Sequence, residues 1–325
     1  MSRFAAHGAR ITDIQAGSSS QPHLLASCAA DGTASLWDLR TSSTVLTVQR
    51  PGGGGTVHSV ALGCDDTLMA TGSKDGAHFY DIRGGGTLLG EYVESHSDDV
   101  LCVRFHPNKP TILMTGGADG LACVFNVAVN GEDEALMTVC NAQSDVIDVK
   151  SLDGDDVLCC QTSVETLCLF RISDGQCVAN WNNFRAAISQ SCGCDHVDYV
   201  VSTYYDYAQS QMHALVGTFA GDLLDVGLNG DGTIVPCGRM SGGHYRPVRC
   251  GLRIGGMIVT GGEDTRLCAW SVSGESGRSG VTVGSGVTVG SGVSGVSGGG
   301  GGSGGSAGKR VGKQKRAKKK TYSPY

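Results

Sequence analysis

The sequence HSDDVLCVRFHP, residues 96–107, brings together residue types that carry out chemistry in many proteins. Imidazole, carboxylate and thiolate groups are the usual protein ligands of zinc, and an imidazole beside a carboxylate can act as a general acid or base. The stretch is therefore either a metal or acid–base site or a set of side chains that a fold requires. Its polar and ionisable residues are His96, Asp98, Asp99, Cys102, Arg104 and His106.

The rest of the chain provides no recognisable catalytic partner for this stretch. The patterns GxSxG, GxxxxGK[ST] and HExxH are absent, and no GxGxxG lies between a strand and a helix. The cysteines of CGC (192–194) have no second pair at zinc spacing. The glycines of PGGGGTV (51–57) precede no helix whose N-terminus would hold phosphate. We expect no enzymatic activity, no cofactor, no bound metal and no small-molecule substrate.

Four segments of the chain resemble one another, and each has the pattern of a β-hairpin. A short β-rich run leads into a turn with Asp followed by Gly or Thr, and a second run ends on an aromatic residue. Asp-Gly between two such runs is the strongest short-range hairpin signal. The segments are SCAADGTASLWDLR (27–40), TGSKDGAHFYDIR (71–83), TGGADGLACVFNV (115–127) and TGGEDTRLCAWSV (260–272).

A histidine precedes three of these hairpins, followed by apolar residues at fixed offsets. His7 precedes Ile11 and Ile14, and His96 precedes Val100 and Val103. Repeats of about 40 residues with this pattern resemble WD repeats, each of which forms one four-stranded blade of a β-propeller. We therefore predict an all-β fold, a WD-repeat β-propeller. Its six visible blades are placed at 7–48, 53–92, 96–140, 144–180, 186–235 and 244–272.

The fourth and fifth units depart from the pattern. In the fourth, Glu165 stands where the turn Asp is expected, and Phe170 replaces the Trp. The fifth has lost both residues, and it carries an additional segment, YYDYAQSQ (204–211), which we interpret as a protruding loop.

In WD repeats, a His, a Ser or Thr, the turn Asp and the Trp can form a hydrogen-bonded chain within one blade. Such buried polar chains stabilise a fold when every member is paired. This pattern gives His96 a structural role, and His106, which precedes Pro107, is expected beside a turn. The candidates are His7, Ser27, Asp31 and Trp37 in the first unit, His96, Thr115 and Asp119 in the third, and His244, Thr260, Asp264 and Trp270 in the sixth.

Three of the fourteen cysteines share one repeat position, two residues before the aromatic residue: Cys123, Cys168 and Cys268. They belong to three different blades, too far apart to bind one metal ion, and each lies on the same face as its aromatic residue. Small apolar packing explains them. Because the N-terminus has no apolar signal-peptide core, so many cysteines indicate a reducing compartment with free thiols.

The C-terminal part of the chain differs in composition from the repeats. Residues 274–308 are rich in Gly, Ser and Val and are expected to form a flexible linker after a propeller domain of residues 1–273. Residues 309–325 carry eight Lys or Arg and no acidic residue, whereas the other 308 residues hold 17 basic and 31 acidic groups. This basic tail is expected to be disordered.

The basic tail predicts a nuclear protein, with cytoplasm as the alternative location. Clustered Lys and Arg residues are typical of import signals and of arms that contact nucleic acid. The expected partners of the tail are therefore an import receptor or RNA, and no membrane is expected. The nuclear-import candidates are Lys309, Arg310, Lys313, Lys315, Arg316, Lys318, Lys319 and Lys320.

Residues 96–146 resemble one particular family, the WD repeat-containing protein 89 family. The resemblance rests on HSDDV followed by VRFHP, on DGLACVFN, and on the acidic segment that leads to CN. It returns at GGHYRPVRC (242–250) and TGGEDTRLCAW (260–270). The family has seven blades, and this chain starts inside a blade. We therefore expect either six blades or a missing first one, with Val281–Val283 or Val287–Val289 supplying the last strand of the final blade.

The resemblance implies an interaction protein without a reaction of its own. We expect a scaffold that binds partner peptides or proteins through its propeller loops, and the acidic body favours basic partners. The protein-binding candidates are Asp98, Asp99, Lys74, Glu263, Tyr245 and Arg246.

A second hypothesis concerns WDLR (37–40) and YDIR (80–83). Both resemble the WDxR box by which some WD-repeat proteins dock on the adaptor of cullin–RING ubiquitin ligases. Arg40 and Arg83 would make the charged contacts, and the propeller would be a substrate receptor.

Overall fold

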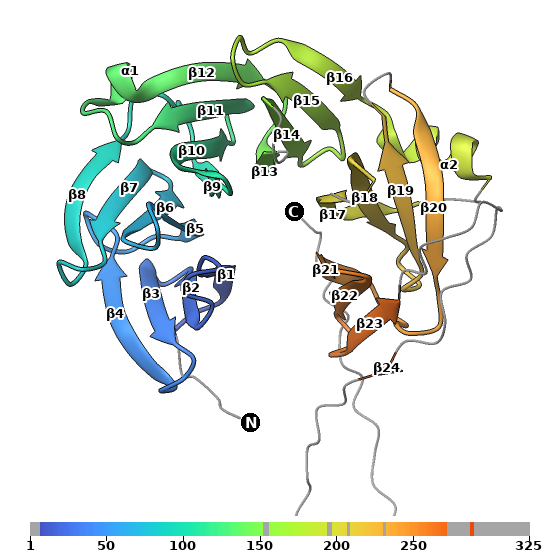
Figure 1. Ribbon diagram of the computed structural model, residues 1–325, viewed down its shortest axis with the longest axis horizontal. Coiled ribbons are helices and arrows are strands. Elements are labelled where there is room, and N and C mark those ends of the chain that lie inside the picture. The colour runs from blue at the N-terminus through green and yellow to red at the C-terminus, as the bar shows by residue number, and fades with distance from the viewer. Residues whose placement is uncertain are drawn as a thin grey trace, which may run out of the picture. The chain divides into compact units, whose positions relative to one another are not determined.

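The computed structural model describes residues 7–151, 156–193, 197–206, 209–229 and 232–271, together with the backbone of residues 287–288. The chain divides into Met1–Gly290, which holds every described element, and Ser291–Tyr325, which lies outside the described residues. Within the first unit, six four-stranded antiparallel sheets stand around a common axis as the blades of a propeller (Figure 1). The predicted all-β propeller with six visible blades is confirmed.

In each blade, four strands that are consecutive in the chain pair in order from the axis outward. The first blade consists of β1 (Ile11–Ala16), β2 (Leu24–Ala29), β3 (Thr33–Asp38) and β4 (Ser43–Gln49). The second consists of β5 (Val57–Gly63), β6 (Leu68–Ser73), β7 (Gly76–Asp81) and β8 (Thr87–Tyr92). The third consists of β9 (Val100–His106), β10 (Lys109–Gly117), β11 (Leu121–Asn126) and β12 (Leu136–Asn141), with the helical turn α1 (Glu132–Ala135) before β12.

The other three blades repeat this order. The fourth consists of β13 (Val146–Ser151), β14 (Val157–Thr162), β15 (Leu167–Arg171) and β16 (Cys177–Trp181). The helix α2 (Phe184–Cys192) precedes the fifth, which consists of β17 (Tyr199–Asp206), β18 (Gln211–Gly217), β19 (Leu223–Leu228) and β20 (Ile234–Met240). The sixth consists of β21 (Val248–Ile254), β22 (Met257–Gly262), β23 (Leu267–Ser271) and β24 (Val287–Thr288).

The same irregularity occurs at the start of the innermost strand of every blade. The pairing of this strand with its neighbour skips one residue, as between Val146 and Asp148 in the fourth blade and between Val248 and Cys250 in the sixth. A skipped residue is a β-bulge, which bends a strand and increases its twist. The repeated bulge therefore indicates that all six innermost strands, which surround the central channel, bend in the same way at their start.

The apolar core is divided into layers between neighbouring blades. The second to fifth blades each bury one face against the preceding blade and the other against the following one, as seen for Val103 and Cys102, which point to opposite sides of β9. Five apolar clusters fill the five junctions from the first blade to the sixth. Alternation of side chains along a strand produces this arrangement, because successive residues face opposite sides of a sheet.

Two expectations for the fifth blade are wrong. The blade does not begin at residue 186, because residues 184–192 form α2, which Asn183 caps and which buries Phe184 and Ile188. The segment YYDYAQSQ is not a loop throughout, since Tyr204–Asp206 continue β17 and Gln211 starts β18. Tyr204 stays in the strand because its hydroxyl donates a 2.7 Å hydrogen bond to the buried Asp225 of β19.

The last strand of the sixth blade comes from the region expected to be a linker. In β24, Val287 pairs with Ala269 and Thr288 with Cys268 of β23. These residues are part of one of the two segments for which this role was expected, and the other, Val281–Val283, lies outside the described residues. A segment rich in Gly and Ser can form this outermost strand, because the strand needs only backbone hydrogen bonds to its one neighbour.

Candidate functional site

The sixth blade contains the complete hydrogen-bonded chain of a WD repeat. The Nδ1 atom of His244 lies 3.0 Å from Asp264 Oδ1, and its Nε2 atom lies 2.9 Å from Thr260 Oγ1. The indole Nε1–H of Trp270 donates to the same hydroxyl at 2.8 Å. A carboxylate only accepts, so His244 carries its proton on Nδ1 and the Thr260 hydroxyl donates to Nε2. All four side chains are buried and paired, which makes this a structural element.

The third and first blades have variants of the same chain. In the third, His96 connects Asp119 at 3.1 Å to Thr115 at 2.7 Å, and the chain ends there because Phe125 has no donor. In the first, His7 contacts Ser27 at 2.7 Å, and Trp37 donates to Ser27 at 2.8 Å.

The first blade differs from expectation at its turn Asp. Thr33 stands between His7 and Asp31: its hydroxyl lies 2.7 Å from His7 Nδ1 and donates to Asp31 at 2.6 Å. The ring and the carboxylate are 3.8 Å apart and have no direct hydrogen bond. The expected contact between His7 and Asp31 is therefore replaced by one through an additional hydroxyl.

The environment of the turn carboxylates stabilises their charged form. Burial opposes ionisation of Asp264, but hydrogen bonds from His244 and from the backbone N–H groups of Tyr245 and Arg266 outweigh it and lower its pKa. The same balance lowers the pKa of Asp119, which accepts from the N–H groups of Leu121 and Ser97. These groups hold turns and are already fully occupied, so they are poor candidates for acid–base chemistry.

His106 has a local role in the turn after β9. Its Nδ1 atom accepts hydrogen bonds from the N–H groups of Asn108 and Lys109, both at 3.1 Å. The described residues include no group of three or more His, Cys, Asp or Glu that would hold a metal ion. The histidines and aspartates of residues 96–107 therefore do not converge on one site.

The repeat cysteines pack inside the sheets. Cys123, Cys168 and Cys268 each pair with the residue at the equivalent position of the second strand of their blade, and all three are buried. Burial raises the pKa of Cys123 and of Cys168 to about 12, which makes the thiolate nucleophile inaccessible at neutral pH. Cys192 lies half-buried at the end of α2, and Cys194 is outside the described residues.

The fifth blade replaces the lost chain with a different buried network. His213 Nδ1 lies 3.0 Å from Asp225 Oδ1, to which the Tyr204 hydroxyl also donates. Burial disfavours the charged imidazole, but the hydrogen bond and charge of Asp225, together with the nearby Cys237, outweigh it and raise the pKa of His213 to about 9. From the sixth blade, Arg253 pairs with Asp206 at 2.9 Å and lies 5.5 Å from the Tyr204 ring centroid. This network therefore connects two blades.

Arg104, one of the residues of the stretch 96–107, lies on the wall of the central channel. Its Nη1 atom donates to Asp13 of the first blade at 2.7 Å and to Ser59 of the second at 2.8 Å. Its Nε atom lies 3.7 Å from Asp148 of the fourth blade, which pairs with Lys150 at 3.1 Å. Burial opposes the charge of Arg104, but the two aspartates raise its pKa above its usual range.

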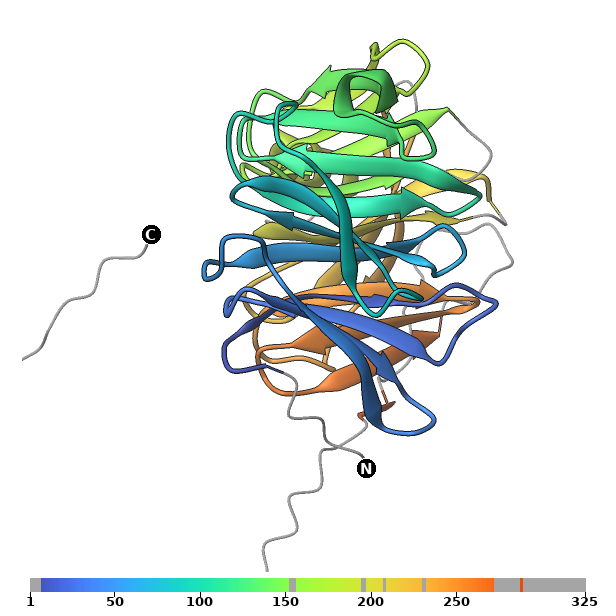
Figure 2. The same ribbon diagram turned by 90° about the vertical axis from the view of Figure 1, so that its left-hand side faces the viewer.

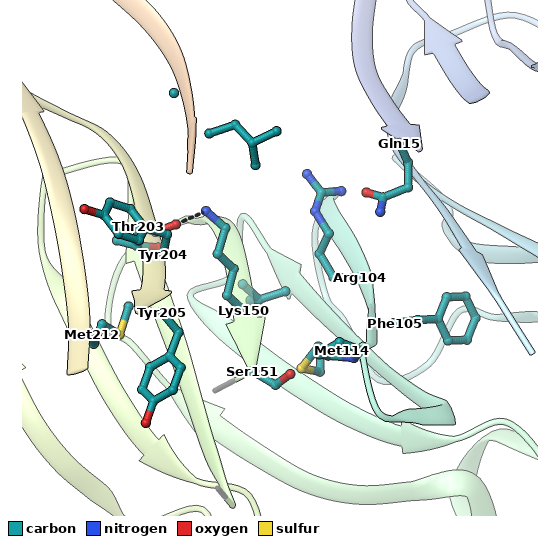
Figure 3. A pocket seen from close by; sticks show the side chains of 14 residues that line it. Gln15, Arg104, Phe105, Met114, Lys150, Ser151, Thr203, Tyr204, Tyr205 and Met212 are labelled. Atoms are coloured by element: carbon teal, nitrogen blue, oxygen red, sulfur yellow. Dashed lines mark hydrogen bonds between the residues drawn. The ribbon is translucent and has the colours of Figure 1, made fainter. Parts of the chain in front are cut away.

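Lys150 adds a contact with the fifth blade to the polar contacts of the channel wall. Its Nζ atom donates to the carbonyl of Thr203 at 2.6 Å (Figure 3). Beside these groups is a pocket of about 320 Å³ whose lining includes Gln15, Arg104, Phe105, Lys150, Thr203, Tyr204 and Leu252. Two cations and two carboxylates balance one another here. The wall is therefore better suited to joining five blades than to binding a charged ligand.

The loop residues expected to bind partners form two groups. On the sixth blade, the ring of Tyr245 lies 4.6 Å from the Arg266 guanidinium, and Glu263 accepts from Arg249 at 2.7 Å. On the third, Asp99 contacts His58 of the second blade at 3.1 Å. Asp98, Lys74 and Arg246 are exposed.

Comparison with known proteins gives the family. The model of the family "WD domain, G-beta repeat" matches residues 1–38 and 86–126. The WD repeat-containing protein GTS1 of Arabidopsis thaliana is 34% identical over 267 residues, which cover 78% of this chain and 67% of that protein. The chain belongs to the WD-repeat family. The WD repeat-containing protein 89 homolog of Dictyostelium discoideum is 26% identical over 61% of this chain and 54% of that protein, which agrees with the resemblance at residues 96–146.

The fold of this WD-repeat chain is also that of a solved structure. A chain in the "Crystal Structure of Mitotic Checkpoint Complex" superposes with a TM-score of 0.66 at 13% identity, over 82% of this chain and 76% of that one. Members of the WD-repeat family are in general protein-interaction scaffolds without enzymatic activity. In the part of the chain that the structure describes, no helix is long and apolar enough to cross a bilayer.

Two aromatic residues of the fifth blade were not identified from the sequence, the exposed Phe219 and the buried Tyr199 that it contacts. Phe219 is 64% exposed and lies 5.7 Å from the Tyr199 ring, above which the Arg249 guanidinium lies at 5.7 Å. By strand register, Phe219 occupies the turn position of Glu263, next to the position of the lost Asp. The sequence signal that could have identified Phe219 was a large apolar residue at an exposed turn position.

The turn of the fourth blade also corrects an assignment. Strand register places Val164, not Glu165, at the position of the turn Asp. Glu165 has a left-handed φ of 64° and its carboxylate accepts from Val200 N–H of the next blade at 2.7 Å. Glu165 therefore joins blades instead of holding its own turn.

Proposed function

We propose that this WD-repeat protein is an interaction scaffold that binds a partner protein through the loops of its fifth and sixth blades. The observation that supports this is a group of aromatic and arginine side chains there, which we call the aromatic–arginine patch. Phe219, Tyr245 and Arg249 are exposed, Arg266 is half-buried beside Tyr245, and the buried ring of Tyr199 packs with Phe219 and Arg249. Aromatic and Arg residues dominate the binding energy of protein interfaces, and ordered rings lose little entropy on binding.

The two blades present this patch as one surface. Gly221, in the turn after Phe219, approaches the backbone of His244 so closely that a Cβ atom would lie 2.7 Å from the His244 carbonyl carbon. His244 directly precedes Tyr245, so the two aromatic residues are carried by turns in contact. Each arginine is preorganised by a ring, and Arg249 also by Glu263.

Two substitutions test the proposal. A tagged full-length chain is compared with Phe219→Ala, Tyr245→Ala and the control Leu89→Ala, whose side chain is 62% exposed on the outer strand of the second blade. We expect at least one captured protein to decrease about tenfold or more with the first two variants, as for the central residues of an interface. Equal capture by all four proteins would contradict the proposal.

We further propose that basic segments of the partner are attracted by the acidic loop of Asp98 and Asp99, on the third blade. Charges at the rim of an interface mainly change association rates. Asp98→Asn is therefore expected to slow association at low salt and to have little effect at high salt.

We also propose nuclear residence, supported by the eight basic residues of 309–325, a segment that lies outside the described residues. If this tail directs import, a fluorescent fusion protein that lacks residues 309–325 should no longer accumulate in the nucleus. RNA contact would instead appear as salt-dependent RNA binding that is lost with the same deletion.

The ubiquitin-ligase hypothesis has one favourable observation. Arg40 and Arg83 follow β3 and β7 at equivalent turns of adjacent blades, and the side chain of Arg40 is 67% exposed although it pairs with Asp38 at 2.8 Å. Capture of the cullin–RING adaptor by the parent chain, and its loss with Arg40→Ala/Arg83→Ala, is the expected result for a substrate receptor.

A further inference from the structure

The first three blades surround a cavity on the face of the propeller that the aromatic–arginine patch does not use. The strands of each blade run between the two faces of the ring, so the turn after the first strand and the turn after the second lie on opposite faces (Figure 2). Phe219 and Glu263 belong to turns after second strands. The turns after the first strands of the first three blades are residues 17–23, 64–67 and 107–108.

The cavity between these three turns, which we call the turn-face pocket, has a volume of about 390 Å³. Two hydrogen bonds connect the segments that line it. Asp66 of the second blade accepts from the Ser18 N–H of the first at 3.0 Å, and the Cys64 N–H donates to the Pro110 carbonyl of the third at 3.0 Å. The pocket is therefore preformed, as most ligand sites are.

The lining combines apolar surface with a carboxylate that has no partner. Leu62 and Phe105 provide the apolar surface, and the ring of Phe105 packs so closely against Gly63 that no Cβ atom would fit there. Asp65 is exposed, and its carboxylate has no hydrogen bond or ion pair with any residue that the structure describes. None of the described residues that line the pocket is Lys or Arg. The pocket therefore has an unbalanced negative charge.

The backbone that presents this carboxylate is strained. Cys64, Asp65 and Asp66 are consecutive, and their φ angles of 51°, 56° and 58° lie in the left-handed region that residues other than glycine rarely occupy. Hydrogen bonds to the neighbouring turns hold Cys64 and Asp66, but no described contact of the Asp65 side chain compensates for its conformation. Strained residues gather at ligand-binding positions. The strain therefore supports a binding role for Asp65.

Apolar surface beside a free carboxylate fits one class of side chain. Lys and Arg place their methylene groups along apolar surface and keep their charge at its edge. We propose that the turn-face pocket binds a Lys or Arg side chain, next to an apolar residue, in an extended segment of a partner protein. Because this site and the aromatic–arginine patch are on opposite faces, the scaffold holds two partners at once.

A library of random peptides displayed on phage tests this chemistry. The library is first depleted on the full-length Ser19→Trp variant, in which the added ring fills the pocket, and is then selected on the full-length parent. We expect the recovered peptides to share a Lys or Arg beside an apolar residue. Replacing that basic residue by norleucine should lower the affinity about threefold to fivefold, as for one exposed ion pair. Failure to recover peptides, peptides without a shared basic residue, or an unchanged affinity would overturn the proposal.

Substitution of Asp65 then locates the contact. Asp65→Asn removes the charge and keeps the shape, and Asn tolerates the left-handed backbone, so the variant should keep the parental Tm. Its affinity for the selected peptides should fall about threefold to fivefold. Asp133→Asn is the matched control, because Asp133 is an exposed aspartate of α1 without a described partner, and its affinity should be unchanged. Equal losses in the two variants would reflect net charge alone and contradict the proposal.

Two further variants separate this site from the rest of the chain. Phe219→Ala/Tyr245→Ala should bind the selected peptides like the parent, because the patch is on the other face, and a loss would place the peptides on the patch and overturn the proposal. If deletion of residues 309–325 increases the affinity, the chain's own basic tail competes for the pocket, and its assignment to a partner is wrong. Failure of the patch variants to reduce capture of a partner would concern the proposed function and leave this site intact.

Discussion

The fifth and sixth blades have the same four-stranded architecture but different polar interiors. The sixth keeps the chain from Asp264 through His244 and Thr260 to Trp270, within one blade. The fifth has His213, Asp225 and Tyr204 instead, and its neighbour contributes Arg253. The repeat network lies within one blade, whereas its replacement connects two blades.

This difference shows that a blade can hold its buried polar groups with more than one set of residues. Buried polar groups cost free energy when they lack partners, and in the fifth blade Asp225 pairs with both His213 and Tyr204. Because the turn of the fifth blade no longer carries the repeat Asp, its exposed Phe219 can contribute to the aromatic–arginine patch.

The largest expected effect is in the fifth blade. Asp225→Asn removes the charge that faces the buried His213, and leaving a buried charge without its partner typically costs about 3–5 kcal/mol of unfolding free energy. Urea denaturation at pH 7 measures it. Asp222→Asn, in the turn just before β19, is the control; its partner Arg239 lies 3.7 Å away, so the change in stability should be less than about 0.5 kcal/mol. Similar losses in the two variants would mean that His213 is not charged.

The two networks should lose their contributions to the unfolding free energy at opposite ends of the pH range. The folded-state pKa of His213 is raised to about 9, so its contribution is complete below about pH 6.5 and is lost as pH rises through 9. The shift corresponds to about 3–4 kcal/mol. The lowered pKa of Asp264 contributes stability above about pH 4 that is lost as pH falls. Unfolding free energies from pH 6 to 9.5 should decline in the parent and remain nearly level in His213→Gln.

The sixth and third blades differ by one hydrogen bond, which gives a smaller effect. Thr260→Val removes the hydroxyl shared by His244 and Trp270, and Thr115→Val removes one that contacts His96 alone. At about 1 kcal/mol for each bond, the expected losses are about 2 and about 1 kcal/mol. Parallel urea titrations compare them, and equal losses would show that the indole adds nothing.

The smallest effect is expected for the acidic loop. Asp98 is exposed and accepts only the N–H of Asp99, so Asp98→Asn should change the unfolding free energy by less than about 0.5 kcal/mol. A thermal melt checks this, with Asp119→Asn as the comparison. A large loss for Asp98 would assign the pair of aspartates to the fold instead of to binding.

Much of the fold follows from patterns within one repeat. The Asp-Gly turns, the alternation of apolar residues and the spacing of His, Thr, Asp and Trp all operate over about 40 residues, so they can be read along the chain. The helix α2 and the long strand β17 could not be read in this way. Phe184 and Ile188 are held by packing between two blades, and Tyr204 is held by Asp225, 21 residues later.

The role of Arg104 shows most clearly what cannot be predicted from the pattern of one repeat. It lies in the stretch that first suggested chemistry, but its partner Asp13 is 91 residues away in another blade, and no local spacing connects them. The aromatic–arginine patch is similar, because Tyr199, Phe219 and Tyr245 come together only when two turns touch.

The sequence by itself determined the blade: its hairpins, its polar chain and the residues that alternate between its faces. Only the tertiary structure decided which faces are covered. Ile11 and Val100 occupy the same repeat position and have almost the same chemistry, yet one is 46% exposed and the other is fully buried. The physical reason is that hydrogen bonds within a blade are local, whereas burial of a sheet face depends on the sheet that packs against it.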